Sequence, residues 1–324
     1  MSTVQFEGRS IPVAAGATVL EALLAGGIEA THSCKAGACG SCMMRATEGA
    51  IPARAQSGLK DSWKAQGYFL PCVCVPESDL SIAAVGSDAQ RAASIAGLER
   101  LSADVIRVRI LCDDPMGFRA GQYVSIGLEG KLARSYSIAC LPGSSDEGRE
   151  IEIHVRRIAG GRMSGWIHDH AKVGDRLTVL GPSGSCFYVP GNEDQPLLLA
   201  GTGTGLAPLY GILLDALRHG HRGLIHLFHG AVHEGGLYLV EELRRLAALH
   251  PQVEYTPAVL NGNGLDAFPV GPVDQVVLQH RPKLNGWRAF VCGDPAIVNV
   301  LRRKIFLAGA ASRDIYADAF VPAA

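Results

Sequence analysis

Residues 33–42 read Ser-Cys-Lys-Ala-Gly-Ala-Cys-Gly-Ser-Cys, which places Cys34, Cys39 and Cys42 at C-x4-C-x2-C spacing. A fourth cysteine, Cys72, lies thirty residues after Cys42 and directly follows Pro71. Four thiolates in this order are typical of a plant-type [2Fe-2S] cluster. The stretch therefore predicts an iron–sulfur site held by Cys34, Cys39, Cys42 and Cys72.

The small residues of this loop support the same prediction. Gly37 and Gly40 permit the positive φ angles that a short loop needs to wrap around a cluster, and the alanines leave room for a close approach. Zinc is one alternative, but it usually takes two separated C-x2-C pairs, and only Cys39 and Cys42 form one here. A disulfide is the other alternative. Cys74 is an alternative fourth ligand, since it lies two residues after Cys72.

The whole chain has the composition of a well-packed globular protein. Its 324 residues predict two or three domains, and a net charge of −1 gives no indication of a nucleic-acid partner. The N-terminus lacks the basic and apolar regions of a signal peptide. The most apolar run, residues 197–214, is interrupted by glycines and a proline, which argues against a membrane span. Nine cysteines without an export signal indicate a reducing compartment, so we expect a cytoplasmic protein.

The first 88 residues predict a compact β-rich module with one helix. Val4 and Phe6 alternate with polar residues in a strand pattern, and Thr18 with Glu21 forms a capping-box pattern at the start of a helix. Gly26 and Gly27 would end that helix. The polar and small residues of 87–96 predict a linker.

Residues 97–192 follow a different pattern, with a period of two. Residues 105–110 and 151–156 alternate apolar and charged side chains, and residues 121–126 and 134–138 predict further strands. Glycine-rich turn signals recur at 160–161, 173–175 and 181–184. This region predicts a small antiparallel barrel.

Residues 193–324 predict alternating strands and helices. Residues 196–200 form a continuous apolar strand pattern, as do 225–228 and 288–292, and helical patterns cover 240–249 and 296–307. Such alternation indicates a parallel sheet with both faces covered. The fold class is thus a multidomain α+β and α/β protein, with domains expected at 1–88, 97–192 and 193–324.

The barrel region contains a flavin-binding pattern. A flavin needs a cation for its pyrophosphate, an aromatic face for its ring and a small donor near its reactive edge. The stretch Arg134-Ser135-Tyr136-Ser137 supplies all of these from one strand. Downstream, Gly161, Arg162, Met163 and Ser164 open a helix whose free N–H groups can hold a phosphate.

The third region contains two candidate nicotinamide loops. Gly201, Thr202, Gly203, Thr204 and Gly205 form a turn between a buried strand and a helix, where a pyrophosphate can approach the helix N-terminus. Cys292, Gly293 and Asp294 form a second strand-to-helix turn. The histidines show no regular metal spacing with acidic residues, so we expect them to be structural.

Together these motifs resemble a known family, the iron–sulfur flavoprotein reductases of ring-hydroxylating dioxygenases and related monooxygenases, of the naphthalene and benzoate dioxygenase reductase type. The resemblance covers nearly the full chain, in the order of an N-terminal β-grasp ferredoxin domain, an antiparallel β-barrel FAD domain and a C-terminal parallel-sheet NAD(P)H domain. It is carried by the cysteine loop, the Arg-Ser-Tyr-Ser stretch, Gly-Thr-Gly-Thr-Gly-Leu-Ala-Pro and the C-terminal residues 286–290 and 315–320.

The resemblance implies roles for individual residues. It implies that Arg134 contacts the FAD phosphates, Tyr136 stacks on the flavin ring and Ser137 lies near N5. It also implies that Cys292 lies beside the nicotinamide and Phe320 near the flavin face. His154, Val155 and Arg156, together with residues 161–164, would line the FAD tail. The family further favours Cys72 over Cys74 as the fourth cluster ligand.

The implied activity is electron transfer from NADH through FAD and the [2Fe-2S] cluster to a ferredoxin or a Rieske terminal oxygenase. Many relatives carry an arginine two residues after the glycine of the second nucleotide-domain strand, where this chain has Val232, followed by Glu234. An arginine would pair with a 2′-phosphate, whereas Glu234 would repel it, so we expect NADH rather than NADPH. The alternatives are a reductase of a di-iron monooxygenase, a non-catalytic electron-carrier module and a zinc-stabilised structural protein.

Overall fold

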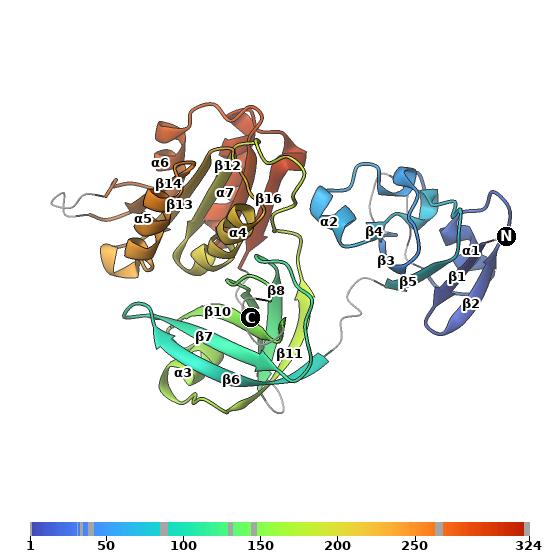
Figure 1. The fold of residues 1–324 in the computed structure, drawn as a ribbon, viewed down its shortest axis with the longest axis horizontal. Helices are drawn as coiled ribbons and strands as arrows, with labels where there is room; N and C mark the ends of the chain where they lie inside the picture. Colours follow the sequence, from blue (N-terminus) through green and yellow to red (C-terminus); the bar gives the residue numbers. More distant parts are fainter. Residues whose placement is uncertain are drawn as a thin grey trace. The chain divides into compact units, whose positions relative to one another are not determined.

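The computed structural model describes residues 2–30, 32, 35–37, 42–84, 90–128, 132–143, 148–262 and 268–320. It consists of two compact units, Met1–Ser87 and Asp88–Ala324. Figure 1 shows the elements of each unit in the order of the chain.

The first unit is a mixed five-stranded sheet with short helices. Its elements are β1 (Ser2–Phe6), β2 (Arg9–Val13), α1 (Val19–Ala25), β3 (Met44–Glu48), η1 (Ala53–Gln56), α2 (Asp61–Ala65), β4 (Tyr68–Phe69), η2 (Pro71–Val73) and β5 (Leu80–Ala84). The strand order is β2-β1-β5-β3-β4, with a parallel β1–β5 pair between antiparallel pairs. Leu23 of α1 packs with Val4 and Phe69 of the sheet in one core. This arrangement confirms the predicted β-grasp module.

The capping of α1 follows the sequence closely. The Thr18 side chain accepts a hydrogen bond from the Glu21 backbone N–H at 3.2 Å, and the Thr18 N–H donates to the Glu21 carboxylate at 2.8 Å. Gly26 is the C-cap, and Gly27 has a φ of 71°. The capping box and the glycine stop are therefore confirmed, because both depend only on residues close in sequence.

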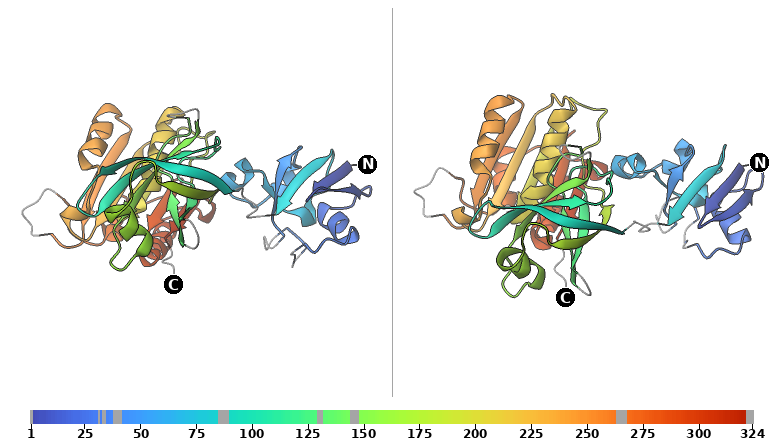
Figure 2. Two further views of the ribbon diagram at one scale, coloured as in Figure 1. Left: turned by 90° about the horizontal axis from the view of Figure 1, so that it is seen from below. Right: turned by 60° about the horizontal axis from the view of Figure 1, so that its bottom comes forward.

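The barrel of the second unit contains six strands and one helix. They are β6 (Gln90–Arg100), β7 (Val105–Cys112), β8 (Tyr123–Leu128), β9 (Leu132–Ser137), β10 (Glu150–Arg156), α3 (Arg162–Asp169) and β11 (Arg176–Ser183). The order is β10-β7-β6-β11-β8-β9 with every pair antiparallel. An antiparallel bridge between Ile138 and Ile153 joins the two ends of this order and closes the barrel (Figure 2). The predicted barrel is thus confirmed.

Two local expectations in this region were wrong. Residues 90–96, which we assigned to the linker, belong to β6, which pairs with β7 on one side and β11 on the other. Ala93 and Ile95 are buried, so pairing with two neighbours outweighs the weak strand propensity of small residues. The turn signal at 181–184 lies largely within β11, where the register with β8 shifts between Leu180 and Ser183.

The rest of the second unit is a parallel sheet covered on both faces. Its elements are β12 (Leu197–Thr202), η4 (Gly203–Gly205), α4 (Leu206–Arg218), β13 (Ile225–Ala231), η5 (Glu234–Gly236), α5 (Val240–Leu249), β14 (Val253–Val259), α6 (Val273–His280), β15 (Arg288–Gly293), α7 (Pro295–Leu307), η6 (Ser312–Asp314) and β16 (Ile315–Ala319). The order is β14-β13-β12-β15-β16, and all pairs are parallel.

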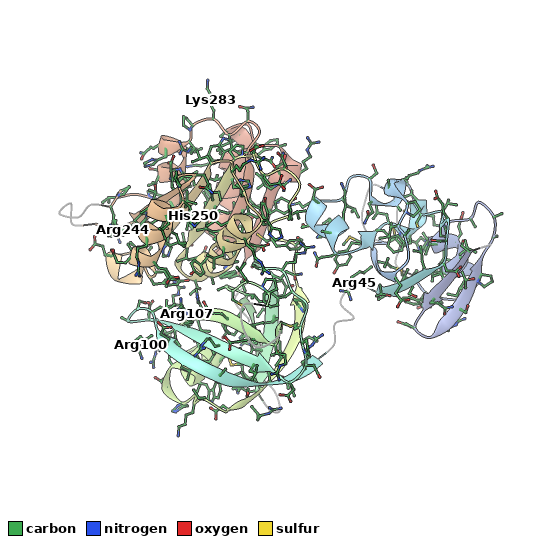
Figure 3. All side chains as sticks on the ribbon, viewed as in Figure 1. Arg45, Arg100, Arg107, Arg244, His250 and Lys283 are labelled. Carbon is green, nitrogen blue, oxygen red and sulfur yellow. The ribbon has the colours of Figure 1, made fainter. Side chains whose placement is uncertain are left out.

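Two separate cores lie on the two faces of this sheet. Leu197 and Leu199 pack in one core with residues of α4 and α5, whereas Leu198 and Ala200 pack in the other with residues of α6 and α7. The side chains fill the layers between helices and sheet (Figure 3). Residues 197–200 of β12 are all apolar because alternate residues face the two different cores.

Candidate functional site

A cavity of about 1000 Å³ lies between the barrel and one edge of the parallel sheet. It is lined by Tyr123, Ser125, Ala133, Arg134, Ser135, Tyr136, Ser137, Arg156, Ile158, Ala159, Gly160, Gly161, Arg162, Met163, Ser164, Thr202, Thr204, Asp294, Asp318, Ala319 and Phe320. This volume is at the upper end of the roughly 300–1,000 Å³ range of small-molecule sites. The cavity therefore suits a large ligand, or two ligands that meet.

Strand β9 supplies the barrel wall of the cavity. Arg134, Ser135, Tyr136 and Ser137 all line it. Burial raises the pKa of the Tyr136 phenol, and the Arg134 charge opposes this only in part, so the phenol is neutral at physiological pH. A neutral aromatic ring beside a guanidinium suits a ligand that has both a planar ring and phosphate groups.

The turn from β10 into α3 forms the adjoining part of the barrel wall. Gly161 is the N-cap of α3, and the Gly165 N–H donates to the Gly161 carbonyl at 2.8 Å. The N–H groups of residues 162–164 precede that first helical bond, so they are the donors a helix start leaves for a ligand. The Ser164 hydroxyl accepts from the Ile158 N–H at 3.1 Å, which fixes the loop that enters the helix.

The glycine turn after β12 forms the opposite wall, but its glycines serve mainly to let backbone segments pack closely together. Thr202 and Thr204 line the cavity, whereas Gly201, Gly203 and Gly205 do not. A Cβ on Gly205 would lie 2.3 Å from the Cys292 carbonyl oxygen, and one on Gly201 would lie 2.8 Å from it. These two glycines therefore allow η4 to pack directly on the end of β15.

Of the second turn, only Asp294 reaches the cavity. Its carboxylate caps α7 by accepting from the Ala296 N–H at 2.9 Å. The Cys292 side chain is buried, with its Sγ 3.7 Å from the Sγ of Cys186. Burial raises the pKa of the Cys292 thiol well above its ordinary value. The position of Cys292 beside a nicotinamide remains a prediction.

The end of β16 contributes one residue that the sequence analysis missed. Asp318 lines the cavity and accepts a hydrogen bond from the Ser137 hydroxyl at 2.9 Å. Burial raises the pKa of this carboxyl, and the Ser137 hydrogen bond opposes the rise. Phe320 also lines the cavity. Strand alternation from Phe320 was the signal that could have found Asp318, because residues two apart share a face.

Of the three residues predicted on strand β10 to line the FAD site, one lines the cavity and two do not. Arg156 lines the cavity, and its Nη1 lies 3.1 Å from where a Cβ on Gly203 would stand. The side chains of His154 and Val155 are buried and are not part of the cavity lining. Val155 packs in the barrel core. Direct contact of these two side chains with a cofactor is therefore not supported by the cavity.

Two of the four predicted cluster ligands fall within the described residues. Cys42 and Cys72 are buried free cysteines, whereas Cys34 and Cys39 lie outside the described residues. Burial raises the pKa of the Cys42 thiol to about 11, and the neighbouring Cys72 thiol contributes to the rise. Cys74 is fully buried in the core, and burial alone raises the pKa of its thiol to about 12. The Cys42 and Cys72 thiols are thus close enough to interact, as two ligands of one cluster would be.

Family comparisons agree with this division of the chain. Residues 2–77 match the 2Fe-2S iron-sulfur cluster binding domain, residues 92–188 the oxidoreductase FAD-binding domain, and residues 199–303 the oxidoreductase NAD-binding domain. The chain is thus an iron–sulfur flavoprotein oxidoreductase with sites for a [2Fe-2S] cluster, FAD and NAD(P)H.

Individual relatives cover nearly the whole chain. It is 33% identical to the naphthalene 1,2-dioxygenase system ferredoxin–NAD(P)+ reductase component of Pseudomonas putida, over 98% of both chains. It is 32% identical to the phenol 2-monooxygenase reductase component of a Pseudomonas species, over 99% of this chain and 94% of the relative. A solved Amycolatopsis cytochrome P450 reductase superposes with a TM-score of 0.68 at 29% identity, over 99% of both chains. This protein belongs to the family of oxygenase-system reductase components in which a ferredoxin domain is joined to a ferredoxin–NAD(P)+ reductase module.

The described residues fit the groups that this family binds. The cavity combines a cation, an aromatic ring and helix N–H donors, as a flavin dinucleotide requires, and it extends to the strand ends where nucleotides bind in parallel sheets. Among the described residues, no helix is long and apolar enough to cross a membrane.

Proposed function

We propose that the protein transfers electrons from NADH, through FAD and a [2Fe-2S] cluster, to a ferredoxin or a Rieske oxygenase of an aromatic-ring dioxygenase system. The observation that carries the proposal is that one cavity is lined both by Arg134 and Tyr136 of the barrel and by Thr202 and Asp318 of the sheet edge. A flavin and a nicotinamide must meet for hydride transfer, and this cavity has a wall suited to each.

The barrel residues would orient the flavin. Arg134 would neutralise the phosphate charge, Tyr136 would stack on the ring, and Ser137 would hold a hydrogen bond at the reactive edge with Asp318 behind it. Ser135, Arg156 and the turn of residues 161–164 would hold the remainder of the dinucleotide. When bound, FAD accepts a hydride as two electrons, and the cluster passes electrons on singly.

The sheet residues would bind the nicotinamide dinucleotide. We assign this role to the turn of residues 201–205, to Cys292, Gly293 and Asp294, and to Phe320 at the flavin face. NADH is the preferred donor in this proposal, because Val232 stands where an arginine would pair with a 2′-phosphate. The cluster ligands would be Cys34, Cys39, Cys42 and Cys72, and the three domains would span about residues 1–88, 97–192 and 193–324, with the strand β6 added to the second.

The acceptor is proposed by analogy with the relatives. Reductases of a dioxygenase system and of a monooxygenase match at 33% and 32% identity, so a di-iron monooxygenase is the second candidate acceptor. Plant-type clusters have potentials of about −400 mV, which requires a partner of higher potential. We place the protein in the cytoplasm, where a reducing environment keeps thiolate ligands intact.

An anaerobic titration tests this function. NADH added to the purified holoprotein should bleach the visible absorbance of both flavin and cluster, and NADH-dependent reduction of cytochrome c should follow. Absence of iron after anaerobic reconstitution, or bleaching of neither chromophore, would contradict the proposal.

Charge reversal tests where electrons leave. Lys35 is exposed in the cysteine loop, with a φ of 51°. Lys35→Glu should slow transfer to the partner protein about fivefold while flavin reduction by NADH is unchanged. The control is Lys283→Glu, at an exposed lysine of the second unit (Figure 3). An equal fall in flavin reduction would show that the cysteine loop is not the exit.

A further inference from the structure

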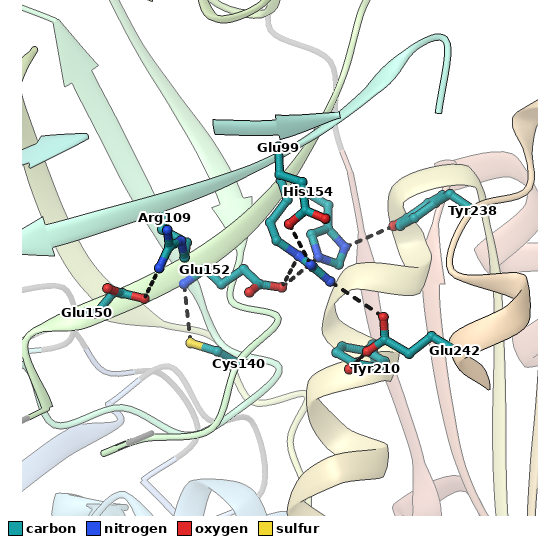
Figure 4. A network of polar contacts seen from close by, with 10 residues as sticks. Glu99, Arg109, Cys140, Glu150, Glu152, His154, Tyr210, Tyr238 and Glu242 are labelled. Atoms are coloured by element: carbon teal, nitrogen blue, oxygen red, sulfur yellow. Dashed lines mark hydrogen bonds and ion pairs between the residues drawn. The ribbon is translucent and has the colours of Figure 1, made fainter. Parts of the chain in front are cut away.

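A largely buried set of polar side chains connects the barrel to strand β13 beside the glycine turn, and the proposed electron path does not use it. The set consists of Arg107, Glu152, His154, Tyr238 and His229. Figure 4 shows Glu152, His154 and Tyr238 of this set. Its members come from β7, β10, the segment before α5, and β13, so the set crosses from the barrel to the sheet.

Arg107 is the anchor of this set on the barrel side. Its guanidinium lies 2.8 Å from Glu99, 3.1 Å from Glu152 and 3.8 Å from Glu242. Glu99 and Glu152 belong to barrel strands, whereas Glu242 belongs to α5 and also accepts from the Tyr210 hydroxyl of α4. The Arg107 side chain is only 17% exposed, so these ion pairs are partly shielded from solvent. They fix the barrel against the helices on this face of the sheet.

His154 links Glu152 to Tyr238 through hydrogen bonds of its two ring nitrogens. Its Nε2 lies 2.9 Å from the Glu152 carboxylate, and its Nδ1 lies 3.2 Å from the Tyr238 hydroxyl. Burial lowers the pKa of His154, and the Glu152 carboxylate opposes this only in part, so the ring is neutral. Since a carboxylate only accepts, Nε2 carries the proton. The Tyr238 hydroxyl must then donate to Nδ1, so that each ring nitrogen of His154 has one defined partner.

Tyr238 lies between two histidine rings. It meets His154 edge-on at 5.4 Å and 84°, and it meets His229 edge-on at 5.4 Å and 85°. His229 is fully buried on β13, in register with Gly201 of β12. Burial lowers the pKa of His229 to about 4, and the backbone of Gly203 opposes this. The set therefore ends on β13, beside the residue of β12 that begins the glycine turn.

The Arg156 guanidinium also lies close to the glycine turn. Arg156, two residues after His154 on β10, places its Nη1 3.1 Å from the Cβ position of Gly203. The end of β10 thus lies close to the glycine turn at Arg156, and His154 and Tyr238 connect it to His229 of β13.

We propose that Tyr238 is a positioning residue that holds the glycine turn at Gly203 against the end of β10, so that a nicotinamide dinucleotide on the turn is aligned with the barrel. This inference rests on the proposed function for the identity of that dinucleotide. It assigns to Tyr238, His154 and His229 an effect on dinucleotide affinity without contact to the ligand.

Tyr238→Phe tests the proposal, because it removes the hydroxyl and keeps the ring. Tyr188→Phe is a closely matched control. The Tyr188 hydroxyl lies 3.1 Å from His221 Nδ1, the two rings meet edge-on at 5.6 Å and 89°, and Tyr188 is 1% exposed against 2% for Tyr238. Both substitutions remove the same kind of buried hydrogen bond, but Tyr188 does not belong to the set that reaches Gly203.

The main measurement is equilibrium binding of NAD+ to the oxidised holoprotein by calorimetry, accompanied by the thermal midpoint and the flavin content. Both variants should lower the thermal midpoint to a similar extent. Only Tyr238→Phe should weaken NAD+ binding, by about tenfold, and raise the KM for NADH more than it lowers kcat. Equal NAD+ affinity in the two variants would overturn the proposal.

A second variant keeps the test decisive if Tyr238→Phe folds poorly. His154→Leu removes the acceptor of the Tyr238 hydroxyl from the barrel side and should weaken NAD+ binding by about the same tenfold. Wild-type affinity in His154→Leu would overturn the positioning role. Because NAD+ binding needs no turnover, a wild-type protein that binds NAD+ but does not reduce its flavin would contradict the proposed function alone.

Discussion

The two walls of the cavity are built on different principles. On the barrel wall, Arg134, Tyr136 and Ser137 present their side chains directly to the cavity. On the sheet wall, Thr202 and Thr204 line the cavity, whereas Gly201, Gly205 and Cys292 pack against one another and do not line it. The barrel motif therefore supplies side chains that contact a ligand, whereas the glycines of the turn determine the path of the backbone.

This difference predicts how each wall responds to substitution. Truncation on the barrel wall should remove a ligand contact and leave the fold intact. On the sheet wall, a single added methyl group should disturb the fold and the ligand site together, because the glycines touch backbone atoms that cannot move aside.

The largest expected effect is on the barrel wall. Arg134→Ala should weaken FAD binding by about 10- to 100-fold, the range expected for loss of charge-assisted hydrogen bonds to phosphate. Titration of the flavin-free protein with FAD, followed by fluorescence, measures it. The control is Arg109→Ala, a 52% exposed side chain 3.9 Å from Glu150 on the barrel surface. If both variants retain FAD equally, Arg134 is not a flavin contact.

The second largest effect is expected from a substitution on the sheet wall. Gly205→Ala places a Cβ 2.3 Å from the Cys292 carbonyl oxygen and must displace the backbone of η4 or β15. We expect a loss of about 1–3 kcal/mol in the free energy of unfolding, with weaker NAD+ binding. Denaturant unfolding and calorimetry measure both quantities. Gly117→Ala, where a Cβ would meet nothing within 4 Å, should be nearly neutral. Similar stability in the two variants would refute the packing role of Gly205.

A gain of charge sharpens the comparison on the sheet wall. Val232 follows β13 and is 53% exposed. Val232→Arg should raise kcat/KM for NADPH about tenfold, because an arginine can pair with the 2′-phosphate. Val173→Arg, at a 66% exposed valine of the barrel domain, is the control. Steady-state rates with both dinucleotides decide the matter, and an unchanged NADPH/NADH ratio in Val232→Arg would rule out this specificity site.

The smallest effect concerns Asp318, where the two walls meet. Burial raises the pKa of this carboxyl above its ordinary value of 3.8, so the folded protein binds a proton more tightly than the unfolded chain. Its contribution to stability is therefore present at low pH and is lost as the pH rises through the folded pKa. Asp318→Asn cannot ionise and still accepts from Ser137.

Thermal unfolding measured at pH values below and above 3.8 tests the sign of this pH dependence. The midpoint of Asp318→Asn, relative to wild type, should increase as the pH rises above 3.8. Asp113→Asn is the control for an exposed carboxyl: the hydrogen bond with Arg176 lowers the pKa of Asp113, so the midpoint of this variant relative to wild type should instead fall as the pH rises toward 3.8. A parallel pH dependence in both variants would show that burial does not control Asp318.

Much of the fold follows from local sequence. The helix expected at 240–249 is α5, and the parallel strands expected at 225–228 and 288–292 lie within β13 and β15. The capping box at Thr18 was predicted because both partners lie within three residues. By contrast, β6 could not be recognised from its small residues, because its strand state depends on partners at β7 and β11.

The cysteine spacing, the strand of Arg134 and the glycine turn were therefore determined by the sequence itself, since each is a local pattern of residue type and period. Only the tertiary structure brought Ser137 to Asp318, which is 181 residues away, and placed Tyr238 between His154 and His229. These contacts depend on how the barrel docks on the sheet. No local pattern encodes such docking, because its free energy comes from burial and hydrogen bonds between segments that are distant in sequence.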